Sequence, residues 1–280
     1  MTKLDIGFLG YGTRALDALM SDRRFNVKYF LTPKSRLCYD VYECAEKYKD
    51  RVNMEIIGSK KELLERISEI KDVSCFLMNA CPFILTKEIL DKMDFYNIHP
   101  GSLFTNRGHQ PHLWTVLLDE RETEICLHKV NTEIDLGYVI ESVKIELTGK
   151  ENSLEVLNKA EDNIPKLLDG LYNYLTGKKK VKYLVKEGKY RHIMDYSDYK
   201  INDNDNIEDI DRKIRARYMH NGAFFERDGK RIYVNEILCC EKSVEKSFKY
   251  NSDSVIYCGN GMKAVFKVKK ITDLDGNIIA

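Results

Sequence analysis

Short apolar runs alternate with segments of helical spacing over the first hundred residues, and this alternation constrains the fold more than any other feature of the sequence. The runs that suggest strands are "LDIGFLG", "FNVKYFLT" and "VSCFLMNA". Between and after them come segments in which apolar residues recur every three or four positions: "TRALDALMSD", "LCYDVYECAEKYKD", "KKELLERISEI" and "TKEILDKM". Such an alternation predicts an α/β fold with a Rossmann-like, mostly parallel sheet and helices on both faces.

The later sequence has a different character. Strand-like pieces "EICLHKV" and "GYVIESVKIEL" precede an amphipathic pattern that predicts one long helix over residues 153–175. An Asx-rich stretch, "INDNDNIEDID", favours turns over a packed element and marks a boundary. Beyond it, Asp228-Gly229 and Asn260-Gly261 are favoured two-residue hairpin turns. We therefore predict a catalytic domain at residues 1–199 and a small β-rich C-terminal domain at residues 200–280.

Composition limits the functional class. The chain has 280 residues, more than the roughly 150 of one modest domain, and its content of 43% apolar and 32% charged residues is that of a folded protein. The 45 basic residues almost balance the 44 acidic ones. Because nucleic-acid binders collect phosphates with a broad positive field, we expect no nucleic-acid partner.

The eight cysteines form no CxxC pair and mostly lie in apolar segments. A zinc site needs paired ligands at short spacing and a disulfide scaffold is usually a smaller secreted chain, so we expect buried thiols and no metal. The N-terminal segment does not resemble a signal peptide, and no apolar run reaches about 18 residues. We expect a soluble, cytoplasmic protein without a membrane partner.

A glycine-rich turn, "GFLGYG", follows the first strand-like run and opens a helix. Its glycines at positions 7, 10 and 12 do not give the GxGxxG spacing of a dinucleotide site, and the acidic residue expected about 20 positions later is missing. The stretch predicts a tight strand-to-helix turn. A second interpretation keeps Tyr11 to Arg14 as backbone and side-chain contacts to an anionic substrate, because free amides at a helix start suit a phosphate.

The stretch "FYNIHPG" places Asn97 and His99 at the end of a strand that Pro100-Gly101 terminates. Side chains alternate along a strand, so both point the same way at the carboxyl edge, where ligands bind open α/β sheets. Asp135 in "TEIDLGY" precedes a second turn. Each residue alone has an ordinary structural explanation, as a packed histidine or a turn former. Together they suit acyl transfer to an amine, with an amide for the oxyanion and an imidazole for the proton.

These motifs resemble the folate-dependent formyltransferase family. The likeness rests on "NIHPGSLFTNRGHQP" with "TEIDLGYVI", on the upstream "FLMNACPFILTKEIL", and on "IDRKIRARYMHNGAFFERDGKRIYV" and "GMKAVFKVKKI" near the end. It implies an N-formyltransferase that uses 10-formyltetrahydrofolate as formyl donor. Carried over by position, it implies that Asn97 polarises the formyl group, His99 handles the proton and Asp135 supports both.

The same resemblance implies where the substrates bind. We expect folate contacts from the loop after the third strand-like run and from the segment before Asp135, although ordinary core packing also explains several of these side chains: Met78, Phe83, Ile84, Leu85, Val130, Asn131 and Glu133. For the acceptor, a guanidinium can clamp a pyrophosphate and polar groups can contact sugar hydroxyls. The acceptor candidates are Tyr11, Arg14, Asn106, Arg107, His109 and Gln110.

Within the family, "HPGSLFTNRGHQP" is nearer to the branch that formylates amino sugars on nucleotides than to the branch that acts on tRNA. Residues 200–280 hold 15 Lys or Arg against 13 Asp or Glu, without the basic excess expected of a tRNA enzyme. The resemblance therefore implies a nucleotide-linked 4-amino-4,6-dideoxy sugar as acceptor and a role in lipopolysaccharide or surface glycan biosynthesis. A methionyl-tRNA formyltransferase, or a binding protein on the same fold, are the alternatives, and a homodimer is compatible with each.

Overall fold

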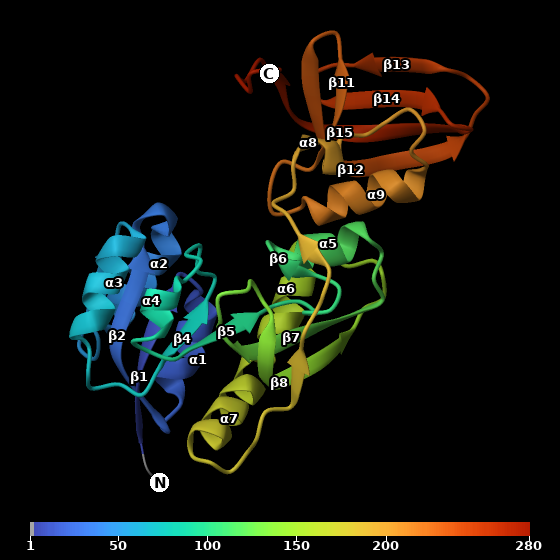
Figure 1. Ribbon diagram of the computed structural model, residues 1–280. Helices are drawn as coiled ribbons and strands as arrows, with labels where there is room; N and C mark the ends of the chain where they lie inside the picture. Colours follow the sequence, from blue (N-terminus) through green and yellow to red (C-terminus); the bar gives the residue numbers. More distant parts are fainter. Residues whose placement is uncertain (1–2) are drawn as a thin grey trace. The chain divides into compact units, whose positions relative to one another are not determined.

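A computed structural model describes residues 3–280 of the chain (Figure 1), which forms two compact units. Of the described residues, the first unit comprises 3–108, 123–145 and 159–190, and the second comprises 109–122, 146–158 and 191–280. Each unit contains segments that are distant in the sequence. The sequence predicts two domains that are continuous along the chain, at residues 1–199 and 200–280. This division stays a prediction.

An eight-stranded sheet forms the centre of the first unit, in the order β3-β2-β1-β4-β5-β7-β8-β9. The strands β1 to β5 run parallel, whereas β7 runs antiparallel to β5 and β9 antiparallel to β8. This confirms the predicted mostly parallel sheet. The strands are β1 (Leu4–Gly10), β2 (Phe25–Pro33), β3 (Met54–Ile57), β4 (Phe76–Asn79), β5 (Phe95–His99), β7 (Glu122–Lys129), β8 (Gly137–Glu146) and β9 (Tyr183–Val185).

Helices flank this sheet as the early alternation predicts. On one face, Leu63 and Ile67 of one helix and Ile89 of another pack against Leu9 and Phe95 of the strands. Burying such side chains is the main stabilising contribution, at about 2 kcal/mol each. The helices and connecting pieces are α1 (Thr13–Ser21), η1 (Lys34–Arg36), α2 (Tyr39–Tyr48), α3 (Lys60–Glu69), α4 (Lys87–Leu90) and α7 (Ile164–Leu175), with a short ribbon of β6 (Arg107–Gly108) and β10 (Tyr190–Arg191).

The prediction of one continuous helix over residues 153–175 is wrong in one respect. The structure divides it into α6 (Ser153–Glu161) and α7, and the break lies just before Pro165. Proline has no backbone N–H and its ring collides with the preceding turn, so it is tolerated only in the first turn of a helix. The apolar spacing continues across the break because both helices bury the same kind of face.

A five-stranded antiparallel sheet, in the order β11-β12-β15-β14-β13, occupies the second unit. Both predicted hairpin turns are confirmed: Asp228 and Gly229 have φ of 52° and 70°, and Asn260 and Gly261 have φ of 47° and 77°. Two positive φ values in a two-residue loop match the right-handed twist of the flanking strands. The elements are α5 (Pro111–Leu117), α8 (Tyr196–Tyr199), α9 (Ile207–Ala216), β11 (Ala223–Arg227), β12 (Lys230–Lys242), β13 (Ser247–Tyr250), β14 (Ser254–Gly259) and β15 (Met262–Asp273).

Candidate active site

The end of β5 brings polar side chains into the interior of the first unit. Asn97 and His99 are two residues apart on this strand, and the His99 side chain is almost completely buried. In the antiparallel pairing with β7, Asn97 lies opposite His128. Directly opposed residues share a face of the sheet, so the register alone places the Asn97 amide beside the His128 ring, with 3.2 Å between Nδ2 and Nε2.

Asp135 connects these groups. It lies in the turn between β7 and β8 with φ of 51°, a left-handed conformation that Asp tolerates better than most residues. Its Oδ2 is 3.5 Å from His99 Nδ1 and accepts a 2.7 Å hydrogen bond from the Gly108 N–H, while its Oδ1 is 3.3 Å from His128 Nε2. The structure thus brings together the three side chains that the sequence singled out; their catalytic roles stay predictions.

The backbone around residue 106 fixes the orientation of the His99 ring. Nε2 of His99 lies 2.9 Å from the Asn106 carbonyl oxygen. A carbonyl only accepts, so this nitrogen carries a proton and donates it. Arg107 holds the same loop in place, donating from Nε to the Gly188 carbonyl and from Nη1 to the Ile134 carbonyl just before Asp135. Nδ1 is therefore the ring nitrogen that faces the carboxylate.

The electrostatics differ from the simplest expectation. Burial lowers the pKa of His99, and this effect outweighs the Asp135 carboxylate, which raises the pKa. The Asp135 carboxylate alone would favour the charged imidazole, whereas the net shift of the His99 pKa has the opposite direction. Burial raises the pKa of Asp135, yet His99, His128 and the Gly108 N–H lower it by more. The resting pair is thus an ionised carboxylate beside a neutral imidazole.

His128 is the member of the site that the sequence reasoning did not identify. Its side chain is buried and its Nε2 contacts both Asn97 and Asp135. One ring nitrogen cannot accept from Asn97 and donate to Asp135 at the same time, so the protonation of His128 decides which contact is a hydrogen bond. The alternating pattern of "EICLHKV" predicts a strand that contains His128, but it does not predict the register that places His128 opposite Asn97.

The residues expected to contact the folate divide into three groups. Met78 and Leu85 are buried in the core cluster beside α3 and α4, and Phe83 and Val130 pack against that cluster. Ile84 is 53% exposed, in a loop without regular structure. The remaining two residues shape the turn before Asp135: the Asn131 side chain donates to the Leu136 carbonyl and accepts from the Glu133 N–H.

The acceptor candidates also have structural partners. Arg14 pairs with Glu161 and Asp162, at 3.4 and 2.5 Å. The Arg36 guanidinium lies over the Tyr11 ring, 5.7 Å from its centroid. Asn106 is fully buried, and His109 and Gln110 belong to the second unit, where Gln110 has φ of 46° just before α5. Contact of these residues with an acceptor stays a prediction.

The glycine-rich turn packs against the end of β4. A Cβ on Gly10, whose φ is 139°, would lie 2.0 Å from the Asn79 carbonyl oxygen, and one on Gly12 would lie 1.7 Å from Asn79 Oδ1. Both distances are far inside contact range, so only glycine fits at these positions. The turn from β1 to α1 is therefore tight because two strand ends approach each other there.

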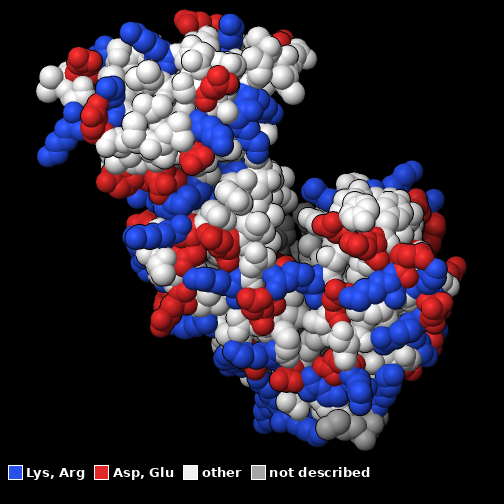
Figure 2. Space-filling model, turned by 180° about the vertical axis from the view of Figure 1, so that it is seen from behind, with Lys and Arg blue, Asp and Glu red and all other residues white. Residues whose placement is uncertain are grey.

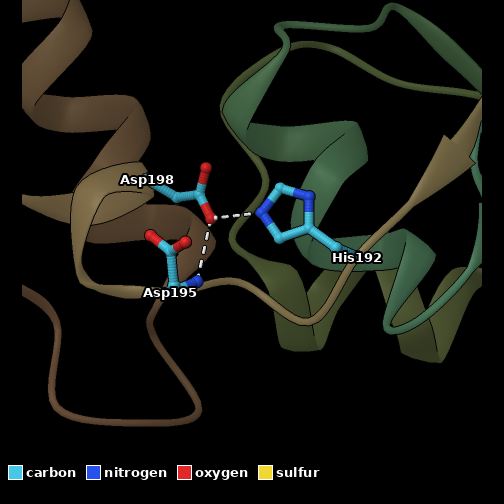
Figure 3. A group of neighbouring side chains, drawn as sticks. All are labelled: His192, Asp195 and Asp198. Carbon is cyan, nitrogen blue, oxygen red and sulfur yellow. Dashed lines mark hydrogen bonds and ion pairs between the residues drawn. The ribbon is translucent and has the colours of Figure 1, made fainter.

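A second group of ionisable side chains lies in the second unit. Figure 3 shows His192, Asp195 and Asp198 pointing toward one another. Asp198 Oδ2 accepts from the Asp195 N–H at 2.9 Å and lies 3.0 Å from His192 Nε2, while Asp195 accepts from the Ser197 N–H. The bonds between Asp195, Asp198 and the backbone form the capping box of α8, and His192 contacts the same Asp198 carboxylate. Capping explains the group, and we assign it no ligand.

The cluster of Asn97, His99 and Asp135 lies at the carboxyl end of β5, and the carboxyl ends of the strands are where open α/β folds bind ligands. No family model matches the sequence. The chain is 31% identical over 202 residues to the methionyl-tRNA formyltransferase of Prochlorococcus marinus (strain MIT 9515), covering 67% of this chain and 61% of that protein. It is 35% identical over 147 residues to the enzyme of the same name from Bifidobacterium longum (strain DJO10A), covering 51% and 45%.

Solved structures share the fold. A 4-N formyltransferase from Francisella tularensis has a TM-score of 0.67 at 17% identity and covers 82% of this chain and 96% of its own. WlaRD, a sugar 3N-formyl transferase solved in the presence of dTDP and 5-N-formyl-THF, has a TM-score of 0.65 at 16% identity over 96% and 99%. HypX from Aquifex aeolicus, in complex with tetrahydrofolic acid, has a TM-score of 0.67 at 16% identity and covers 98% of this chain and 45% of its own.

By sequence the chain is similar to methionyl-tRNA formyltransferases, and it shares the fold of solved formyltransferases that include a sugar 3N-formyl transferase. It spans about half to three fifths of the length of the first two curated relatives. Among residues 3–280, every helix is too short or too polar to cross a membrane.

Proposed function

We propose that the protein transfers a formyl group from 10-formyltetrahydrofolate to the amine of a nucleotide-linked amino sugar of the 4-amino-4,6-dideoxy type. The observation that carries the proposal is the buried cluster of Asn97, His99, His128 and Asp135 at the end of β5. An amide donor, a neutral imidazole and an ionised carboxylate are the groups that direct attack of an amine on a formyl carbon requires.

In this mechanism the acceptor amine attacks the formyl carbon, and the carbonyl oxygen becomes an oxyanion that the Asn97 amide stabilises by donating a hydrogen bond. The amine must then lose a proton. His99 Nε2 is engaged with the Asn106 carbonyl, so Nδ1 receives this proton. The imidazolium lies 3.5 Å from Asp135 Oδ2, which stabilises the new charge, and the proton then passes to N10 of the departing tetrahydrofolate.

No nucleophilic Ser or Cys takes part, because the acceptor itself is the nucleophile. Burial of His99 supports this role: a lowered pKa keeps the imidazole neutral, and hence able to accept a proton, at neutral pH. The donor carries the formyl group to be transferred, and residues 78–85 together with residues 130–135 are the segments that we expect to contact its pterin.

A sugar acceptor is supported by relatives of the fold, which include the Francisella tularensis 4-N formyltransferase and the sugar 3N-formyl transferase WlaRD. Charge supports it as well, since Lys and Arg are interspersed with Asp and Glu over the face seen in Figure 2. Formylation of methionyl-tRNA is the second candidate, favoured by the 31% identity to the Prochlorococcus marinus enzyme.

Purified protein incubated with 10-formyltetrahydrofolate and a panel of nucleotide amino sugars tests the proposal. We expect donor consumption that depends on one of these sugars, with product heavier by one formyl group in mass spectrometry. The His99→Asn variant is the control for background hydrolysis. Consumption of 10-formyltetrahydrofolate with methionyl-tRNA, but with none of the sugars, would support formylation of methionyl-tRNA instead.

A further inference from the structure

A cluster of aromatic rings and arginines lies in the second unit, where α8 and α9 meet β11 and β12. Phe224 is its centre, with ring centroids 5.8 Å from Tyr196, 5.5 Å from Tyr199 and 5.3 Å from Tyr233. The rings of Tyr199, Phe224 and Tyr233 are buried, whereas Tyr196 is 48% exposed. Two guanidinium groups cover these rings: Arg217 lies 4.2 Å from the Tyr199 centroid and Arg231 lies 4.0 Å from that of Tyr196. We call these six residues the aromatic–arginine cluster.

Arg217 differs from the neighbouring arginines in having no acidic partner. Among residues 3–280, no carboxylate forms an ion pair with it, and its Nε is buried without a hydrogen-bond partner. Burial lowers the pKa of Arg217, with only tyrosines among the groups that oppose this effect. An unpaired guanidinium that is partly removed from water is costly, and a bound anion would offset the cost. Other arginines of this unit are paired: Arg212 with Asp209, Arg215 with Asp211 and Arg227 with Asp203.

Two tyrosine hydroxyls near Arg217 have unused hydrogen-bonding capacity. Within the described part of the chain, the hydroxyls of Tyr199 and Tyr233 bond to no other residue, although their rings are buried. Burial raises the pKa of both tyrosines, so each keeps its proton at neutral pH and can donate it. Arg217 lies over the Tyr199 ring, and Tyr199 and Tyr233 both pack against Phe224, which places the guanidinium and the two tyrosines in one neighbourhood.

The surroundings are positive. The Lys270 ammonium lies 5.0 Å from the Tyr233 centroid, and Lys269 lowers the pKa of His220, as do burial and Arg217. The carboxylate of Glu226 is shared between Lys200 and Arg231, and Asp195 is a second carboxylate close enough to raise the pKa of Tyr199. A tetrahedral dianion accepts from several donors at once and is suited to arginine.

We propose that Arg217, Tyr199 and Tyr233 bind a phosphoryl group of a small phosphate, at a site made by the second unit alone. This site is additional to the His99 site and does not depend on the proposed formyl transfer. The faces of the Tyr196 and Tyr199 rings are covered by arginines, so the site recognises the anion and does not stack a base. Inorganic pyrophosphate and a nucleoside diphosphate share this chemistry.

Isothermal titration of the full chain with inorganic pyrophosphate, a nucleoside diphosphate and the unphosphorylated nucleoside tests the proposal. We expect saturable binding of pyrophosphate, weakened about 10-fold or more by Arg217→Gln, since a hydrogen bond to a charged group is lost. Equal losses for pyrophosphate and the nucleotide would identify the phosphoryl group as the feature recognised. If Arg217→Gln weakens binding of the nucleoside diphosphate, and every form of the protein binds pyrophosphate less tightly than the nucleotide, the phosphoryl group that the site binds is that of a nucleotide.

Tyr199→Phe separates binding from a purely structural stacking role. It keeps the ring under Arg217 and removes only the hydroxyl, so thermal stability should hold while pyrophosphate binding weakens severalfold. Arg227→Gln is the matched control, because Arg227 also lies over a ring, Phe248, but is paired with Asp203. Unchanged pyrophosphate binding in Arg217→Gln, or Arg217-dependent binding of RNA without any binding of pyrophosphate, would overturn the proposal.

Discussion

Two strand ends of the same parallel sheet carry residues that the sequence singled out, and the structure uses them differently. At the end of β1, Gly10 and Gly12 allow close approach to Asn79. At the end of β5, Asn97 and His99 project into a buried polar cluster. Both ends lie where a parallel sheet usually binds ligands. The comparison shows that position at this edge is not sufficient: the side chains present decide whether a strand end packs closely or carries a cluster of polar groups.

The first strand end is closed by contacts within the protein. Asn79 donates from Nδ2 to the Ile98 carbonyl, and its Oδ1 points to the place where a Gly12 side chain would be. The next charged residue, Arg14, is paired with Glu161 and Asp162. Substitutions at the two ends should therefore change different quantities, turnover at β5 and stability at β1.

The largest effect is expected for His99→Asn. We expect turnover to fall by about 100-fold or more, because general acid–base help is typically worth 10²–10⁴. Steady-state formylation of the accepted acceptor measures this, and circular dichroism confirms the fold. Turnover close to that of the unmodified protein would mean that His99 at the end of β5 has only a packing role, like the glycines at the end of β1.

Asp135→Asn should lower turnover by about 100-fold, since it removes the charge that stabilises the imidazolium and keeps the side chain's shape. Asn also tolerates the positive φ of this position. Burial lowers the pKa of His99 and Asp135 opposes that change, so its removal lowers the pKa further. The low-pH limb of the rate profile should then move to lower pH than in the unmodified protein. An unmoved limb with normal turnover would make Asp135 only a turn former.

Gly10→Ala should lower the free energy of unfolding by about 2 kcal/mol, because the new methyl group meets the backbone oxygen of Asn79 at a φ that disfavours any side chain. Gly177→Ala is a matched control with φ of 73° and open space around its Cβ, and we expect about 1 kcal/mol from backbone strain alone. Urea unfolding of both variants measures the difference. Equal losses would show that the close approach at β1 contributes nothing beyond strain.

Arg14→Ala should have the smallest effect. The Arg14 side chain is 44% exposed, and an ion pair at that exposure contributes less than about 1 kcal/mol. Any contact of its guanidinium with the acceptor competes with two carboxylate partners, so we expect this contact to be weak and the KM of the acceptor to rise by less than about threefold. A tenfold rise in KM with unchanged stability would place Arg14 in the acceptor site after all.

The fold was predictable where local chemistry decides it. The alternation of strands and helices predicted the sheet, and Asp228-Gly229 and Asn260-Gly261 predicted two hairpins, because few dipeptides adopt two positive φ values. The break at Pro165 was missed because the apolar period runs on across it. Periodicity reports which face is buried and is silent on whether the backbone is continuous.

The site was predictable in part. Period-two alternation and the terminating Pro100-Gly101 indicated Asn97 and His99, the turn after Asp135 indicated that residue, and the family resemblance implied the role of each. His128 was not predicted, because its place opposite Asn97 depends on the register between two strands some thirty residues apart. The direction of the His99 pKa shift could not be predicted from the sequence either. It depends on how completely the rest of the unit buries the ring, which no local pattern reports.

The pairing of Asn97 with His128 across β5 and β7 has a consequence for how the protein is made. Every side chain of the buried cluster lies between residues 97 and 135, so the ribosome has synthesised all of them before it begins the second half of the chain. A one-residue slip of the β5–β7 register would send His128 to the opposite face and abolish the cluster at once. Errors of strand pairing during synthesis should therefore yield folded but inactive molecules, rather than molecules of intermediate activity.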